Sequence, residues 1–290
     1  MKGIVLAGGS GTRLRPATSI YSKQLLPIYD KPMIYYPLSV LMQAKIKEIL
    51  IICTDRDLES YKTLLGDGSQ LGISLHYKVQ PAPDGIASAF ILGKEFIKKD
   101  SVCLILGDNI FYSYGMSNFL SKEVKKVRNN AFIFGYKVSN PQDFGVVEFT
   151  KDGKVKKIIE KPKKPSSNYA VVGLYLYDNR VIEYAQTLKP SKRGELEITD
   201  LNNIYLKNGK LNVSLLEEGF AWLDTGTHQS LLDASQFVST LEKRQGIKIG
   251  CLEEISYRNQ WISKKQLKLC MKLYEGTDYE MYLKKILKSK

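Results

Sequence analysis

The 290-residue sequence is poor in the residues that most metal centres and covalent catalytic centres use. It has two histidines, His76 and His228, and four cysteines that share no metal-like spacing. A zinc site or a serine–histidine–aspartate triad needs a richer supply of imidazoles or thiols, so neither is expected. Two of the cysteines lie in apolar, strand-like runs, and we predict reduced, buried thiols. The four are Cys53, Cys103, Cys251 and Cys270.

Long hydrophobic runs are also missing. The longest candidates, residues 49–53 and 102–106, are far shorter than the roughly 18 residues that a membrane helix needs. The first residues lack the long apolar segment and small-residue cleavage site of a secretory signal. We therefore expect a soluble, cytoplasmic protein. With 43% hydrophobic residues, the chain can bury one large core or two modest ones.

The net charge of +13 raises the hypothesis of a nucleic-acid partner. Much of the excess lies in residues 243–290, which hold 12 Lys or Arg and 5 Asp or Glu. Lysines there are spaced as on the solvated faces of helices, and no nucleic-acid-binding module is recognisable. A sugar phosphate or a nucleotide fits the remaining positive charge at least as well, and a basic nucleic-acid binder stays an alternative.

The first two-thirds of the chain alternate short apolar runs with helix-like segments. Strands are expected at residues 2–7, 48–54, 74–80, 101–106 and 131–138. Helices are expected between them, at residues 32–44, 57–65, 86–97 and 115–128. This order is typical of an α/β fold, Rossmann-like, with a mixed but mainly parallel sheet flanked by helices.

The order changes after residue 140. An Asp-Gly pair at 152–153 predicts a hairpin of residues 145–150 and 154–160. Strands are then expected at 169–177 and 211–216, and helices near 179–188, 197–207 and 227–244. The last of these helices carries an apolar stripe of Leu231, Ala234, Val238 and Leu241. We predict one α/β domain at 1–243 and a helical C-terminal extension at 244–290 that makes a subunit or regulatory contact.

A glycine-rich turn, residues 8–11, follows the first strand. It is not a P-loop, because no Lys-Ser/Thr pair follows, and Leu14 stands where a dinucleotide-binding loop needs its third glycine. The turn lies at the carboxyl end of a strand, where open α/β sheets bind ligands, and glycines let backbone N–H groups approach anionic oxygens. Arg13 adds a planar fork for phosphate, and Lys23 adds a compact charge. The alternative is a tight turn beside surface cations.

Eight ordered blocks of the sequence carry a family resemblance. Residues 6–14, Leu-Ala-Gly-Gly-Ser-Gly-Thr-Arg-Leu, and 22–27, Ser-Lys-Gln-Leu-Leu-Pro, resemble the signature of the sugar-1-phosphate nucleotidylyltransferases. The others, with Cys-Leu-Glu-Glu-Ile near the C-terminus, resemble the members that use dTTP and glucose 1-phosphate. They lie at residues 30–37, 80–85, 107–109, 169–175, 193–200 and 222–228.

The resemblance covers nearly the full length and implies a reaction. In the family, α-D-glucose 1-phosphate attacks the α-phosphorus of dTTP in line, with Mg²⁺, and dTDP-glucose and pyrophosphate are formed. Bringing two anions together requires cations, a metal and positioning, and no covalent nucleophile. The resemblance also implies a homotetramer, regulation by dTDP-L-rhamnose, and a place in dTDP-rhamnose and lipopolysaccharide or cell-wall polysaccharide biosynthesis.

Two aspartates are candidate metal ligands. Asp108 follows a buried strand and Asp224 follows a strand-like segment. Two carboxylates together with substrate phosphates suit a partly hydrated Mg²⁺, although either residue alone could simply form a turn or cap a helix. The resemblance implies that both bind the metal, and it implies catalytic roles for Arg13, Lys23, Asp108, Lys161 and Asp224.

The resemblance further implies which residues bind each substrate. Those for the sugar phosphate are Lys23, Asn109, Gly145, Glu160, Lys161, Val171 and Arg193. Lys161 and Arg193 would contact phosphate, and Glu160 would contact the sugar hydroxyls. The alternatives are an exposed ion pair for Glu160 and Lys161, a solvent-facing side chain for Arg193, and core packing for Val171.

Those for the nucleotide are Leu6, Gly8, Gly9, Gly11, Thr12, Arg13, Gln80, Pro83, Gly85 and Asp108. The Gln80 amide offers a donor and an acceptor, which match the O4/N3 edge of thymine and of uracil alike.

Two segments depart from the family pattern. Phe144 stands where a tyrosine is more frequent, and residues 112–115 also differ. In the family, this second neighbourhood and the C-terminal helices resemble a regulatory nucleotide-sugar site at a subunit contact. The same chemistry with UTP or another sugar 1-phosphate stays open, as does a nucleotide-sugar sensor that has lost catalysis. The presence of Arg13, Lys23 and both aspartates favours an active enzyme.

Overall fold

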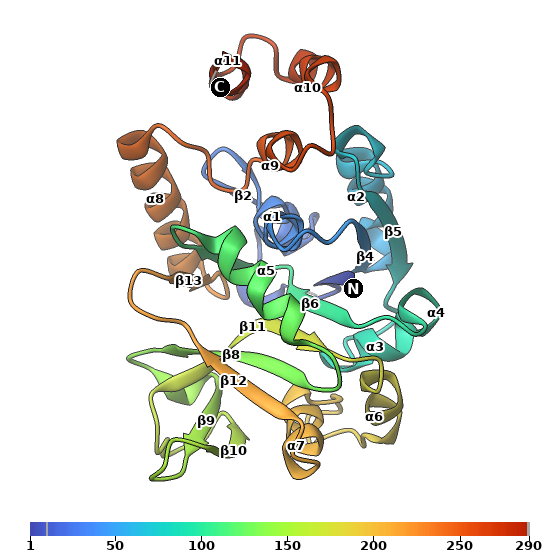
Figure 1. The fold of residues 1–290 in the computed structure, drawn as a ribbon, viewed down its shortest axis with the longest axis vertical. Coiled ribbons are helices and arrows are strands. Elements are labelled where there is room, and N and C mark those ends of the chain that lie inside the picture. The colour runs from blue at the N-terminus through green and yellow to red at the C-terminus, as the bar shows by residue number, and fades with distance from the viewer. Residues whose placement is uncertain (10, 289–290) are drawn as a thin grey trace.

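A nine-stranded sheet forms the centre of the protein (Figure 1). The computed structural model describes residues 1–9 and 11–288. Seven strands follow the order β10-β9-β11-β6-β1-β4-β5, and β8 pairs with β11 and with β12. The strands are β1 (Lys2–Ala7), β4 (Glu48–Cys53), β5 (Ser74–Val79), β6 (Val102–Leu106), β8 (Ala131–Lys137), β9 (Gly145–Phe149), β10 (Val155–Glu160), β11 (Tyr169–Tyr177) and β12 (Leu211–Leu215).

One half of the sheet, β6-β1-β4-β5, is parallel. Its inner strands are nearly continuous apolar runs, as expected where helices cover both faces. The register places Leu6 beside Leu106, and the Gly107 amide donates to the Leu6 carbonyl at 2.9 Å. The turn after β1 and the turn after β6 therefore lie side by side.

The other half is largely antiparallel. β11 runs antiparallel to β6, β8 and β9, whereas β12 is parallel to β8. The β9–β10 hairpin predicted from the Asp-Gly pair is present and stands between β8 and β11 in the chain. The sheet is thus mixed, and the predicted α/β class with helices on its faces is confirmed.

Two pairs of short strands lie outside the main sheet and were not predicted as pairs. β7 (Asn109–Tyr112) pairs antiparallel with β13 (Ala221–Asp224), and β2 (Pro27–Ile28) pairs with β3 (Lys31–Pro32). The prediction that Pro32 opens a helix is wrong, because this residue belongs to β3 and the helix begins at Tyr35. The predicted helix at 86–97 is two short helices that meet at Gly93.

Eleven α-helices complete the described part of the chain. They are α1 (Tyr35–Gln43), α2 (Leu58–Leu65), α3 (Ser88–Leu92), α4 (Lys94–Ile97), α5 (Met116–Lys126), α6 (Val181–Thr187), α7 (Ile198–Lys207), α8 (His228–Gln245), α9 (Leu252–Arg258), α10 (Lys264–Met271) and α11 (Asp278–Lys288). None of the described helices is long and apolar enough to cross a membrane.

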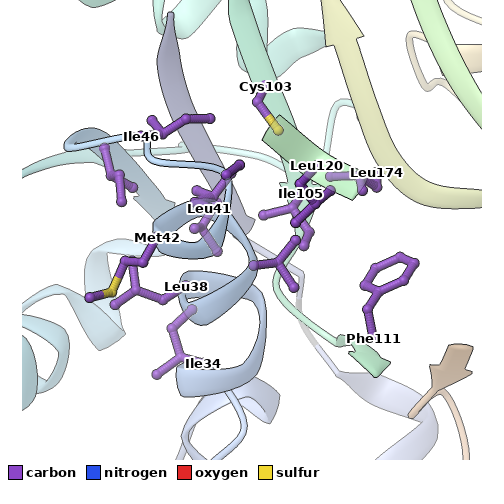
Figure 2. Close-up of a cluster of buried hydrophobic side chains, with 14 of the residues drawn as sticks. Ile34, Leu38, Leu41, Met42, Ile46, Cys103, Ile105, Phe111, Leu120 and Leu174 are labelled. Carbon is purple, nitrogen blue, oxygen red and sulfur yellow. The ribbon is translucent and has the colours of Figure 1, made fainter. Parts of the chain in front are cut away.

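The sheet buries a separate hydrophobic cluster on each face, because successive side chains of a strand point to opposite sides. Ile105 packs with Leu38 and Leu41 of α1 and Leu120 of α5 (Figure 2). The neighbouring Leu104 belongs to the opposite cluster, which includes residues of α3, α6 and α7. The four cysteines are buried and unpaired, as predicted.

The C-terminal half of the chain adds two smaller clusters. On α8, Ala234 and Val238 are fully buried against the β2 and β7 strands, with Leu231 and Leu241 packed beside them, so the predicted stripe is confirmed. Helices α9 to α11 share a core of their own and stand at one end of the molecule (Figure 1). Residues 289 and 290 of the predicted extension lie outside the described residues.

Candidate active site

A cavity of about 330 Å³ opens at the carboxyl end of β6, between the β9–β10 hairpin, β11 and β13. It collects predicted site residues from across the sequence. These are Arg13, Asp108, Asn109, Gly145, Glu160, Lys161, Val171, Arg193 and Asp224. Of the described residues, the remaining predicted ones do not line it: Leu6, Gly8, Gly9, Gly11, Thr12, Lys23, Gln80, Pro83 and Gly85.

The glycine turn meets the predicted base-reading residue directly. A side-chain carbon at Gly8 would lie 2.0 Å from Oε1 of Gln80, so the close approach requires glycine. Gln80 is buried and donates one amide hydrogen to Ser88 Oγ at 3.0 Å, which leaves one donor and the oxygen. Gly11 has a left-handed φ of 60°, and Ser10 of the same turn lies outside the described residues.

The loop after β5 is stiff, but its glycine faces protein. Gly85 has a φ of 93°, and a side-chain carbon there would lie 2.5 Å from the Leu196 carbonyl oxygen. The Leu196 amide also donates to the Asp84 carbonyl at 2.7 Å. The missing side chain of Gly85 therefore lets this loop pack against the loop before α7.

Asp108, which lines the cavity, forms an ion pair with Lys23. Lys23 Nζ lies 2.7 Å from Asp108 Oδ2, and Asn109 Nδ2 donates to Asp108 Oδ1 at 2.8 Å. Burial alone would raise the pKa of the Asp108 carboxyl, but the Lys23 charge and these hydrogen bonds outweigh burial and hold its pKa below the ordinary value. Asp108 is therefore ionised at neutral pH.

Asp224 reaches the same place from β13. It stands opposite Asn109 in the β7–β13 pair, and Thr225 donates through its hydroxyl to the Asp108 carbonyl at 2.9 Å. Arg13 lies close by, since a side-chain carbon on Gly226 would be 3.3 Å from Asp224 Oδ2 and 3.5 Å from Arg13 Nη1. The two predicted metal ligands thus sit on adjacent strand ends beside an arginine.

The two carboxylates suit a sparse magnesium site. Among the described residues, no group of three or more His, Cys, Asp or Glu side chains could hold a metal ion. Mg²⁺ commonly takes one or two carboxylates and completes its shell with water and substrate phosphate. Because Asp108 is ionised and Asp224 lines the same cavity, the residues present fit that requirement.

Glu160 ends the second strand of the hairpin, and Lys161 directly follows it. Thr199 donates to Glu160 Oε2 at 2.7 Å, which fixes the carboxylate at the cavity wall. Lys161 has a left-handed φ of 42°, uncommon for a residue with a side chain, and its amide donates to the Phe144 carbonyl at 3.0 Å. The backbone here is set by the hairpin, and Lys161 lines the cavity.

Arg193 is held by three carboxylates. Its Nη2 lies 2.8 Å from Glu197 Oε2, 3.6 Å from Glu160 Oε1 and 3.7 Å from Glu195 Oε2. The hydrogen bond to Glu197, with the nearby charges, raises the pKa of the Arg193 guanidinium. A sugar phosphate that approached Arg193 would have to compete with these carboxylates.

Several wall residues were not singled out from the sequence, among them Trp222, Thr199, Glu197 and Tyr175. Trp222 Nε1 donates to Asn109 Oδ1 at 2.6 Å, and the same oxygen accepts from the Gly173 amide at 3.1 Å. Phe144 packs edge-on against Trp222 with ring centres 5.1 Å apart. These four wall residues lie within the motif blocks, so their blocks were the available signal.

Asn109 and Val171 line the cavity and also stabilise the surrounding fold. The Asn109 side chain is buried, and its hydrogen bonds to Asp108, Trp222 and Gly173 hold the cavity walls together. Val171 lines the cavity and also belongs to a buried hydrophobic cluster, so the predicted contact and the alternative of core packing coexist.

Comparison with known proteins places these features in a family. The nucleotidyl transferase family profile matches residues 2–240. A glucose-1-phosphate thymidylyltransferase of Neisseria meningitidis serogroup A is 56% identical over 288 residues, which is 99% of this chain and 100% of that protein. One of Mycobacterium tuberculosis is 52% identical over 287 residues, 99% of each chain.

Solved structures agree with the fold. A crystal structure with bound sucrose, assigned as a glucose-1-phosphate thymidylyltransferase of Bacillus anthracis, is 43% identical with a TM-score of 0.75, and covers 82% of this chain and 94% of that chain. A UDP-glucose pyrophosphorylase complexed with UDP-glucose, at 24% identity and a TM-score of 0.71, shares the fold over 82% of this chain and 98% of its own.

Proposed function

The chain belongs to the nucleotidyl transferase family, and from that premise we propose that it forms dTDP-glucose and pyrophosphate from dTTP and α-D-glucose 1-phosphate. One observation supports this reaction above the others. An ionised aspartate paired with a buried lysine lies beside a glycine turn, in a cavity that also holds a second aspartate and further cations. Such a site can bring two anions together without a covalent nucleophile.

The cations divide between the two substrates. Arg13 and Lys23 stand at the strand-end edge with the glycine turn, where they would bind the triphosphate and stabilise the charge that develops on pyrophosphate. Lys161 lines the cavity directly after β10, where it would bind the phosphate of glucose 1-phosphate. Glu160, held by Thr199, would accept hydrogen bonds from sugar hydroxyls. We propose Arg193 as a second contact to the sugar phosphate, which would replace its carboxylate partners on the guanidinium.

Asp108 and Asp224 are the residues that would hold Mg²⁺. The bound ion would supply positive charge to the nucleotide phosphates and help to orient them. The Lys23 ammonium keeps Asp108 ionised, and the Thr225 hydroxyl ties the Asp108 backbone to the end of β13. Both carboxylates are therefore placed before substrate binds.

The nucleotide lies, in this proposal, over the glycine turn. The backbone of Gly8, Gly9, Gly11 and Thr12 would contact phosphate and ribose. Gln80 would read the base with its remaining donor and its oxygen. Leu6, Pro83 and Gly85 shape the surroundings of the base. Since thymine and uracil share the O4/N3 edge, the proposal of dTTP as the substrate depends on the curated relatives.

One incubation tests the reaction. The protein is mixed with dTTP, UTP, glucose 1-phosphate and Mg²⁺, and the products are resolved by mass. We expect dTDP-glucose in excess over UDP-glucose, together with pyrophosphate. If UDP-glucose is the main product, the substrate is UTP and not dTTP. If no nucleotide sugar is formed, the proposed activity is refuted. Omitting Mg²⁺ should abolish turnover.

A second cavity of about 370 Å³ lies away from the first, between the end of β7, the start of α5 and α9. Tyr112, Ser113, Arg258 and Asn259 line it, and the Tyr112 hydroxyl donates to Gln245 Oε1 at 2.9 Å. We propose it as the regulatory site for dTDP-L-rhamnose. Unchanged turnover at saturating dTDP-L-rhamnose would reject this role.

Residues 244–290 are, in the same proposal, a separate regulatory unit that joins subunits into a homotetramer. The exposed apolar side chains Leu269, Leu273 and Met281 on this extension favour such a contact. Sedimentation equilibrium should give four times the 32.9 kDa chain mass, and a monomer would reject the assembly. We propose a cytoplasmic location, where four buried free thiols stay reduced.

A further inference from the structure

The segment that carries Lys23 has little regular structure of its own. It runs from the glycine turn to two short 3₁₀ turns, Thr12–Leu14 and Lys23–Leu25. Yet the Lys23 side chain is 8% exposed and its ammonium lies 2.7 Å from Asp108. Something outside the segment must hold the backbone at Lys23 in place.

Asp57 provides one such contact. Its side chain is only 3% exposed, and its Oδ1 accepts a hydrogen bond from the backbone amide of Ser22, the residue before Lys23, at 3.1 Å. Oδ2 accepts from the Thr54 hydroxyl at 2.5 Å, and Arg56 donates to both oxygens at 3.2 Å. Thr54 directly follows β4, so the carboxylate is fixed to the central sheet.

Tyr61 provides a second contact to the same residue. The Ser22 hydroxyl donates to Gln24 Oε1 at 2.7 Å and lies 2.9 Å from the Tyr61 hydroxyl, which then acts as the donor. Tyr61 is fully buried on α2, and Ser22 is 1% exposed. Both the backbone and the side chain of Ser22 are therefore tied to the β4–α2 segment.

An aspartate that only stabilised its own helix would make different hydrogen bonds. Asp57 is the residue that precedes α2, a position where aspartate usually accepts a hydrogen bond from its own helix. Here its side chain makes no such cap, and its carboxylate instead reaches a residue 35 positions away in the chain. The geometry is that of a clamp on the lysine segment.

We infer that Asp57 is a positioning residue for Lys23, assisted by Tyr61. The carboxylate does not touch substrate; it acts through Ser22 to keep the Lys23 ammonium at Asp108. This inference rests on the proposed function only for its effect on turnover, because the predicted loosening of Lys23 can be measured without any substrate.

The chain offers a matched control, Asp178. It is also a buried aspartate, 3% exposed, that binds a nearby arginine, Arg180, and accepts from a buried tyrosine, Tyr205, at 2.8 Å. It follows Tyr177, which pairs with Val102 at the opposite end of β6 from the site. Asp178→Asn should thus perturb folding to a similar degree without reaching Lys23.

The first experiment measures amine labelling of Lys23 by acetic anhydride, with peptide mass spectrometry and exposed Lys62 of α2 as internal reference. Asp57→Asn should raise the Lys23 rate about fivefold, the factor for one lost hydrogen bond of roughly 1 kcal/mol. Tyr61→Phe, a milder change that keeps the ring, should raise it less. Asp178→Asn should leave it unchanged. Equal labelling in Asp57→Asn, Tyr61→Phe and wild type would overturn the inference.

The second experiment is a double-mutant cycle on turnover of dTTP and glucose 1-phosphate. Asp57→Asn should lower kcat by about tenfold to a hundredfold, the loss expected when a catalytic group is displaced by about 1 Å. In a Lys23→Ala background it should cost almost nothing more, whereas Asp178→Asn should have the same small effect in both backgrounds. Additive losses for Asp57 and Lys23 would overturn the inference. An inactive wild type would count against the proposed function alone, since the labelling result stands independently.

Discussion

Replacing Asp108 by asparagine separates the charge of the carboxylate from its shape. The amide keeps the volume but leaves Lys23, with an 8% exposed side chain, without its counter-ion. Removing one partner of a fully buried ion pair costs about 3–5 kcal/mol. The Asp108 side chain is 28% exposed, so water relieves part of this cost, and we expect a loss of about 2 kcal/mol. For a chain of this length that is a fall in Tm of roughly 4–8 °C.

The effect on turnover should be larger than the effect on folding. Asp108 is one of the two residues proposed to hold Mg²⁺, and we expect kcat for dTDP-glucose formation to fall at least about a hundredfold. Pyrophosphate release gives the rate, and thermal unfolding by circular dichroism gives Tm. Both are measured on the same preparation, so that loss of folded protein is not mistaken for loss of catalysis.

A second substitution distinguishes the two effects. Lys23→Met in the Asp108→Asn background removes the stranded charge, so we expect Tm to recover by several degrees while turnover stays lost. A folded Asp108→Asn protein with turnover within about twofold of wild type would refute the reasoning. So would a double variant that is less stable than the single one, since the ion pair would then not be the source of the destabilisation.

Three further predictions follow from the same geometry. Gly8→Ala should displace the Gln80 amide, which would lie 2.0 Å from the new carbon, and raise KM for dTTP about tenfold with Tm nearly unchanged; an unaltered KM would contradict the placement of the base. Gly173→Ala should destabilise the protein by about 1–3 kcal/mol, measured by urea unfolding, because the new carbon would lie 2.5 Å from Asn109 Oδ1; wild-type stability would contradict this packing. Because the pKa of Asp108 is lowered in the folded protein, its contribution to stability is present above the unfolded pKa near 4 and is lost as pH falls through the lower folded pKa. Asp108→Asn should therefore flatten that part of the acid-unfolding curve. An unchanged curve would contradict the pKa shift.

Much of the fold could be predicted from local patterns. The parallel strands are apolar runs bounded by turns, and the bounds of β11 and α8 were predicted within one or two residues. The short strands β3 and β7 could not be predicted in the same way. β7 is stabilised by β13, which is distant in the chain. β3 pairs with its close neighbour β2, but Pro32 read alone favours the first turn of a helix. Asp224 and Asn109 pair although they are far apart in the chain, so a local sequence pattern cannot predict the contact.

The candidate site shows the same division. From their positions after strands and their chemistry, Arg13, Lys23 and Asp108 were predicted to share one site. The structure places them at one edge of the sheet. The partners that these groups acquire could not be predicted. Arg193 looked like a free cation, but three glutamates gather around it when the loop before α7 folds back on the hairpin. Asp57 was predicted only as the first residue of a helix, and only the folded chain brings Ser22 to it.

The central claim is that this edge of the sheet gathers fixed cations and two carboxylates around two substrates that repel each other. A crystal structure with dTDP-glucose and Mg²⁺ tests it most directly. We predict the diphosphate and the sugar in the cavity bounded by Asp108, Lys161 and Asp224, with the thymine beside Gln80 and the ion on both aspartates. Ligand bound only in the second cavity, beside Tyr112 and Arg258, would contradict the account.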